Sequence, residues 1–260
     1  MTPTASPGVV PEIPSREVAD YCIALADDTL VLSQRLVYWV TRSPELEIEL
    51  AMANIGLDLL GQARSLLAYG GSADGRTEDD LAYLRQENEF RNLKMCEIPG
   101  HDFGEAVARL LLFSTFQRHL YDGLTGSSDP ILAAVATKAV KEVRYHQVFA
   151  GGWTTRLGDG TSESHERMQA GLVRLWPYVA ELFDDDPVVG HAPDGVAIDP
   201  RTFAEAWRAD VEDVISAATL TVPETWTSPS GGRRGVHTEH LGGLLSEMQH
   251  VHRVFPRVDW

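Results

Sequence analysis

Residues 43–64 read SPELEIELAMANIGLDLLGQAR, a long stretch with no Lys or Arg between Arg42 and Arg64. On an α-helix, at about 100° per residue, its apolar side chains form two faces. The first face contains Leu46, Leu50, Ala53, Leu57 and Leu60, and the second contains Ile48, Met52, Ile55 and Leu59. Because exposed helices usually carry some basic residues, we predict that this helix is buried on most sides.

The rest of the 260-residue chain has the same helical periodicity almost throughout. Caps, prolines and glycines divide it into helices predicted at residues 15–40, 43–69, 77–90, 103–124, 130–157, 162–183, 200–220 and from about 237 onward. No series of alternating strands and no internal repeat is found. The pattern predicts an all-α protein: a four-helix bundle with additional helices, forming one domain over residues 15–260.

Composition excludes several classes of protein. The chain has 22 basic and 38 acidic residues, a formal net charge of -16, which argues against nucleic-acid binding. Residues 1–14, MTPTASPGVVPEIP, lack the features of a signal peptide and are predicted to be a disordered leader. No stretch approaches the ~20 apolar residues of a membrane span. Cys22 and Cys96 have no metal-type spacing and are predicted to be core thiols of a cytoplasmic protein.

A narrow polar line separates the two apolar faces of the second helix. It consists of Glu47, Asn54, Asp58 and Gln62. A polar line inside a helical bundle has two interpretations: a structural hydrogen-bond network, or the ligands of a metal centre. The second interpretation requires matching ligands on other helices.

The stretch KEVRYH, residues 141–146, is the best match, because Glu142 and His146 share one helix face. A ferritin-like di-iron site needs one Glu from each of two helices and a Glu-x-x-His pair from each of the other two. Here the spacing is four, and the second helix offers no histidine. We therefore predict that Asp28, Asp58, Gln62, Glu142 and His146 outline a metal site whose ligand set is incomplete, and that they are now structural.

Five segments carry a resemblance to a known family. They are LVLSQRL, PELEIELAMANIGLDLLGQAR, KEVRYH, GVAIDPRT and GVHTEHLGGLLSEMQ. From about residue 20 to the C-terminus, the chain resembles the PaaC family, structural subunits of the ring 1,2-phenylacetyl-CoA epoxidase. The resemblance implies a ferritin-like fold and a non-catalytic role in a multicomponent monooxygenase of aerobic phenylacetate degradation.

The resemblance also implies partners and cofactors. The di-iron centre is expected in a homologous catalytic subunit of PaaA type, and no cofactor is expected in this chain. A small accessory subunit and a reductase, which carries flavin and iron–sulfur groups and delivers electrons from NADPH, complete the expected system. Phenylacetyl-CoA is the expected substrate of the complex.

Three further features bear on these expectations. Arg233 and Arg234 lie in the glycine-rich loop SPSGGRRG, where they are candidates to contact an acidic partner or the phosphates of coenzyme A. Glu247 and His250 form the one Glu-x-x-His pair, in the last helix outside the expected four-helix core, and are predicted to be on the surface. This pair keeps a second interpretation open, that of an independent ferritin-like di-metal protein or oxidase.

Overall fold

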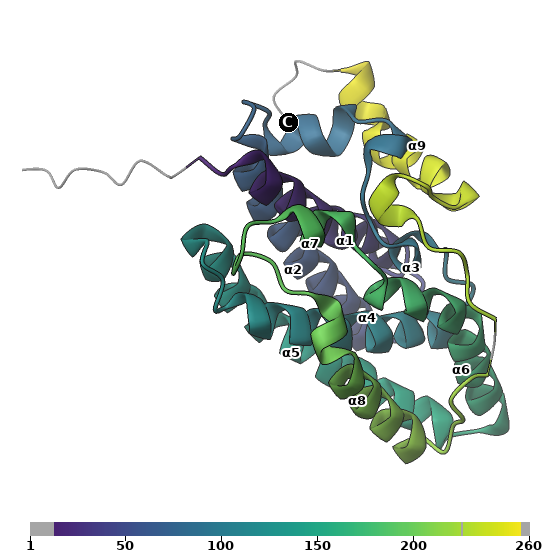
Figure 1. Ribbon diagram of the computed structural model, residues 1–260. Coiled ribbons are helices and arrows are strands. Elements are labelled where there is room, and N and C mark those ends of the chain that lie inside the picture. Colours follow the sequence, from purple (N-terminus) through teal and green to yellow (C-terminus); the bar gives the residue numbers. More distant parts are fainter. Residues whose placement is uncertain (1–12, 225, 256–260) are drawn as a thin grey trace, which may run out of the picture.

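The computed structural model describes residues 13–224 and 226–255 (Figure 1). Over these residues it contains nine α-helices, short 3-10 and π-helical segments, and no strand, so the prediction of an all-α fold is confirmed. The four longest helices are α1 (Arg16–Val37), α2 (Leu46–Gly71), α4 (Phe103–Leu124) and α5 (Pro130–Gly158). Of the predicted leader, residues 1–12 lie outside the described part of the chain.

The long helices pack in pairs, α1 along α2 and α4 along α5, and α2 also contacts α5. Two further helices, α6 (Ser162–Leu175) and α8 (Ala204–Ala217), pack against α4 and α5. In Figure 1, α7 and α8 lie in front of the long helices. The largest fully buried side chains include Trp207, Tyr21, Tyr121, Phe113 and Phe116. The core therefore continues from the long helices into the C-terminal additions.

Helix ends follow the capping residues. Ser15 accepts a hydrogen bond from the backbone N–H of Val18 at the start of α1, and Asp129 accepts two at the start of α5. The last helix, α9 (Glu239–Val254), starts after the N-cap Thr238, close to the predicted residue 237. Two short helices, α3 (Lys94–Glu97) and α7 (Pro187–His191), were not predicted, because four or five residues are too few to show a helical period.

Two predicted helices are interrupted. Residues 77–90 form a π-helical turn, Asp80–Leu84, and a 3-10 turn, Glu87–Glu89, with Arg85 extended between them. The predicted helix 162–183 ends as α-helix at Leu175 and continues as a 3-10 segment. Pro177 explains the change, because proline has no N–H to donate and its ring clashes with the carbonyl of the preceding turn.

The prediction that α2 is buried on most sides is wrong for one of its two apolar faces. Ile48, Met52, Ile55 and Leu59 are buried, as predicted. On the other face, the exposed fractions are 65% for Leu46, 58% for Leu50, 64% for Leu57 and 40% for Leu60. The absence of basic residues between Arg42 and Arg64 is therefore not explained by burial within the described structure.

Candidate functional site

Four of the five predicted site residues meet between α2 and α5. The Nε2 atom of His146 lies 3.0 Å from Oδ2 of Asp58, and Nε2 of Gln62 donates to Oε2 of Glu142 at 3.0 Å. Each helix contributes two residues that are four positions apart. The earlier residue of α2 pairs with the later residue of α5, and the later residue of α2 pairs with the earlier residue of α5, so the two helices run antiparallel. The sequence spacing thus predicted which side chains share a face, and the structure supplies their partners.

This α2–α5 network does not fit a di-iron centre. It contains two carboxylates, one imidazole and one amide, whereas a ferritin-like centre needs four carboxylates and two imidazoles. Glu142 also lies 3.6 Å from the ammonium group of Lys138, and Oε1 of Gln62 is buried without a hydrogen-bond partner. Among residues 13–224 and 226–255, no three His, Cys, Asp or Glu side chains are grouped as metal ligands.

Three buried hydroxyl groups of α1 and α4 add no ligands to this network. Thr29 and Ser33 on α1 donate to the backbone carbonyls of Ala26 and Leu30, and Ser114 on α4 bonds within its own helix in the same way. Such local bonds satisfy a hydroxyl without a partner on another helix.

Asp28, the fifth predicted residue, lies in a different cluster, where it binds Arg233. Its Oδ2 atom accepts from Nη2 of Arg233 at 2.7 Å, and its Oδ1 atom accepts from Nη1 at 3.1 Å. The remaining guanidinium donors reach Asp186, at 2.9 Å from Nε, and the carbonyls of Ala24 and Arg91. Only 8% of Arg233 is exposed and its donors are engaged within the chain, which disfavours the predicted contact with a partner or with coenzyme A.

The glycines of this loop allow it to pack closely against neighbouring segments of the chain. The backbone N–H groups of Gly231 and Gly232 both donate to Oε1 of Glu181, at 2.8 Å each. A Cβ atom on Gly232 would lie 2.1 Å from the carbonyl oxygen of Asn92, so only glycine fits there. Arg234 is exposed and keeps its predicted role as a possible surface contact.

A second buried ion pair lies next to the first. Asp27 binds Nη1 of Arg85 at 2.9 Å and accepts from the backbone N–H of Arg91 at 2.8 Å. The aspartates at positions 27 and 28 thus hold two segments that are distant in sequence against α1. Burial alone would lower the pKa of Arg233, but Asp28 and Asp186 raise it above its ordinary value, so the guanidinium stays charged. In the sequence, these buried ion pairs were indicated only by two adjacent aspartates within an apolar helix.

The third buried cluster surrounds Glu97 at the start of α9. Its Oε2 atom lies 2.8 Å from Nδ1 of His237 and accepts from Asn92 at 2.8 Å, while its Oε1 atom accepts from the backbone of Thr238. Burial lowers the pKa of His237, but the hydrogen bond and charge of Glu97 together raise it above its ordinary value. Both side chains are closed to solvent, so this cluster is structural.

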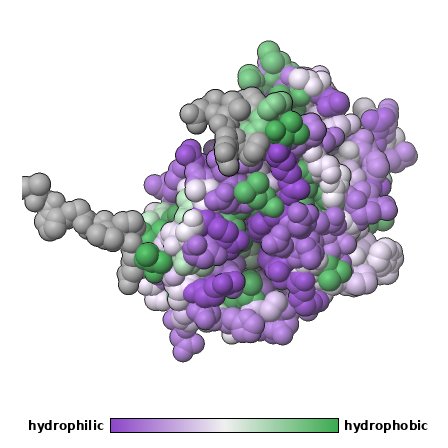
Figure 2. Space-filling model, turned by 90° about the horizontal axis from the view of Figure 1, so that it is seen from above, coloured by the Kyte–Doolittle hydropathy of each residue, from purple (hydrophilic) through white to green (hydrophobic). Residues whose placement is uncertain are grey.

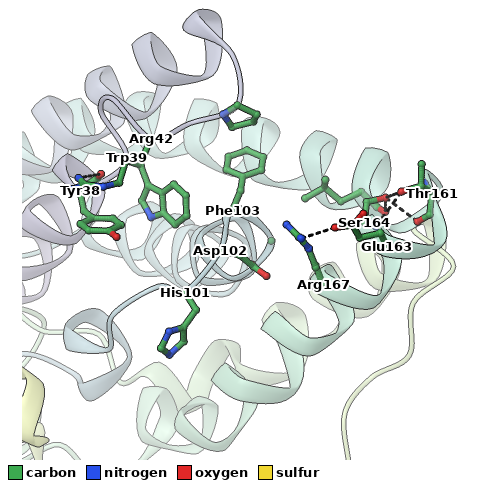
Figure 3. A pocket seen from close by; sticks show the side chains of 13 residues that line it. Tyr38, Trp39, Arg42, His101, Asp102, Phe103, Thr161, Glu163, Ser164 and Arg167 are labelled. Carbon is green, nitrogen blue, oxygen red and sulfur yellow. Dashed lines mark hydrogen bonds and ion pairs between the residues drawn. The ribbon is translucent and has the colours of Figure 1, made fainter.

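A pocket of about 590 Å³ opens beside the turn between α1 and α2 (Figure 3). Trp39 and Phe103 form its aromatic wall, with ring centroids 6.2 Å apart. Two of its charged residues have partners: Arg167 pairs with Glu163, and Asp102 caps α4. None of the predicted site residues lines it.

The Glu247–His250 pair is exposed on α9, as predicted. Cys22 and Cys96 are buried free thiols, also as predicted, and burial raises the pKa of Cys22 to about 12. No helix in the described ranges is both long enough and apolar enough to span a bilayer. Seen from above, the surface is mostly hydrophilic, with hydrophobic residues in small groups (Figure 2).

Comparison with known proteins identifies the family. The model of the phenylacetic acid catabolic protein family matches residues 1–260. The chain is 46% identical, over 246 residues, to the C subunit of 1,2-phenylacetyl-CoA epoxidase from Escherichia coli strain K12. That alignment covers 94% of this chain and 99% of the relative, and it confirms the resemblance inferred from the five segments. The chain therefore belongs to the phenylacetic acid catabolic protein family.

Proposed function

We propose that this chain is a non-catalytic, structural subunit of a multicomponent di-iron monooxygenase that epoxidises phenylacetyl-CoA in aerobic phenylacetate degradation. The observation that carries the proposal is the 46% identity to the Escherichia coli epoxidase protein, over nearly the full length of both chains. The di-iron centre belongs, in this proposal, to a homologous PaaA-type subunit. Electrons come from NADPH through the flavin and iron–sulfur reductase, and the complex also contains a small accessory subunit.

The course of the helices supports a single ferritin-like domain over residues 15–260. Because α2 and α5 run antiparallel, and α4 reverses into α5 through a short turn, α4 starts at the end of the bundle opposite the end of α2. The segment between α2 and α4 must therefore run back along the bundle. One long crossover of this kind is a feature of ferritin-like folds.

The composition of the α2–α5 network supports the non-catalytic assignment. Asp58 and Gln62 stand on α2, and Glu142 and His146 on α5, where a ferritin-like bundle places metal ligands. Each is instead engaged with a side chain on the facing helix. In this role, the residues fix the register of α2 against α5, and the chain's contribution to turnover is to hold the catalytic subunit in its active form.

Reconstitution from separately purified subunits tests the proposal. Iron should co-purify with the PaaA-type subunit, and NADPH-dependent turnover of phenylacetyl-CoA should require that subunit, this chain and the reductase together. About two iron atoms per molecule of this chain alone, lost on Glu142→Gln, would favour the independent di-metal oxidase. Glu166→Gln is the matched control, since it removes an exposed glutamate on α6 that belongs neither to the network nor to the Glu247–His250 pair. Full turnover by the PaaA-type subunit and reductase alone would contradict the structural role.

A further inference from the structure

The outer face of α2 carries an exposed row of leucines, which we call the leucine row: Leu46, Leu50, Leu57 and Leu60. Their spacing of four, seven and three residues places them along one side of the helix over about 21 Å. The opposite side of α2 is buried against α1 and α5. Soluble monomers rarely expose a continuous apolar strip of this length, and such strips usually mark an interaction surface.

The shape of the leucine row suits a helix rather than a small molecule. None of the four leucines lines the pocket beside Trp39 or the hollow between α2 and α5, whose lining includes Gly61 and Glu142. The row is therefore a ridge on the surface of α2. Ridges made by residues three, four and seven apart pack into the grooves of a neighbouring helix.

Charge around the leucine row disfavours a second copy of this chain. Glu45, Glu47 and Glu49 lie at its N-terminal end, Asp58 lies beside it, and no Lys or Arg occurs between Arg42 and Arg64. A two-fold dimer through the row would bring the same acidic surface against itself. With a net charge of -16 on each chain, such a contact would be repulsive. A partner with an apolar helix face and basic side chains around it is complementary.

We propose that the leucine row is the surface through which this chain binds a different, homologous helical subunit whose contact face has a basic rim. The identity of that subunit as the PaaA type rests on the proposed function. The family model is named for PaaA and PaaC together, so a second bundle of related fold is available within the same family. The four leucines form the apolar centre of the interface, and the acidic residues around them form its polar rim.

The test compares charge insertions in two places. The double variant Leu50→Glu/Leu57→Glu places two carboxylates in the proposed interface. The control Val173→Glu/Val251→Glu places them on α6 and α9, at apolar residues that are 46% and 48% exposed. Binding to the purified PaaA-type subunit is measured by calorimetry. We expect Kd to rise by about 100-fold or more for the first variant, because buried unpaired carboxylates oppose association, and to stay within about threefold for the control.

Two further measurements keep the result interpretable. Thermal melts show whether each isolated variant is folded; if the leucine variant is not, radical footprinting of the wild-type chain replaces it, and Leu50 and Leu57 should be protected in the complex. Unchanged affinity, or no protection, overturns the inference while the proposed function stands. A wild-type chain that does not bind the PaaA-type subunit overturns the proposed function as well. A wild-type homodimer that the leucine variant converts to monomer would show that the occupant is a second copy.

Discussion

The buried ion pairs of α1 and the network between α2 and α5 are both polar contacts inside one bundle, yet they are satisfied to different degrees. Every donor nitrogen of Arg233 has an acceptor, and Asp28 receives a further hydrogen bond from the backbone of Leu93. Between α2 and α5, Gln62 and His146 each make one cross-helix bond, and Oε1 of Gln62 has no partner. The two sets therefore differ in how completely their polar atoms are hydrogen-bonded.

The difference indicates which set the fold depends on. The ion pairs connect α1 to segments up to 205 positions away, so their loss would remove the polar contacts that hold the loop before α9 against α1. The α2–α5 network connects helices that are already packed through apolar side chains. Within this network Asp58 is 35% exposed, so water can supply its remaining hydrogen bonds, whereas Oε1 of Gln62 is buried.

The largest expected effect is the loss of Arg233. The substitution Arg233→Met leaves the carboxylates of Asp28 and Asp186 without their main partner, which should lower the free energy of unfolding by about 3–5 kcal/mol. The matched control is Arg234→Met, at the exposed neighbour, with an expected change within about 0.5 kcal/mol. Urea unfolding of both variants measures the difference. Equal effects would show that the ion pair is not what holds this segment.

The sequence could not reveal this ion pair. Arg233 follows two glycines, and a local pattern of that kind usually indicates a mobile loop. Its true partner, Asp28, is separated from it by most of the chain, and only the folded structure brings them together. The four long helices were predictable because apolar spacing and caps such as Asp129 are local signals.

The second expected effect concerns the α2–α5 network. Asp58→Ala removes the partner of His146, whose side chain is 1% exposed, and should cost about 1–3 kcal/mol. Asn54→Ala, one turn earlier and exposed on the same helix, is the control and should change stability little. Both are measured by urea unfolding. A loss as large as that of Arg233→Met would remove the distinction between the two sets.

This network was half predictable. Residue spacing placed Asp58 with Gln62 and Glu142 with His146, because residues four apart share a helix face. The crossed pairing, and the separation of Asp28 from the group, depend on how the helices align, which no local pattern determines. The lack of basic residues between Arg42 and Arg64 was ambiguous for a related reason, since burial inside the chain and burial against a partner leave the same sequence pattern.

A smaller effect should appear as a pH dependence at Glu97. The folded pKa of His237 is raised above its ordinary value of about 6.5, so the protonated form stabilises the fold. That contribution is complete below the unfolded pKa and is lost as pH rises through the folded pKa. The difference in unfolding free energy between wild type and His237→Gln should therefore shrink as pH rises above about 6.5. A difference that is constant with pH would show that this histidine contributes only as a neutral group.

The smallest effect on the isolated chain is expected at the leucine row, and it separates packing within the chain from packing against a partner. Leu57 is more than half exposed, whereas Leu59 is 1% exposed on the opposite face of α2. Leu57→Gln should change the free energy of unfolding by no more than about 0.5 kcal/mol, because glutamine is also a good helix former and little apolar contact is lost. Leu59→Gln should be much more destabilising, because it buries an amide in the core. If urea unfolding of the isolated chain showed equal losses for the two variants, the outer face of α2 would already be packed within this chain, and the leucine row would not be free to bind a partner.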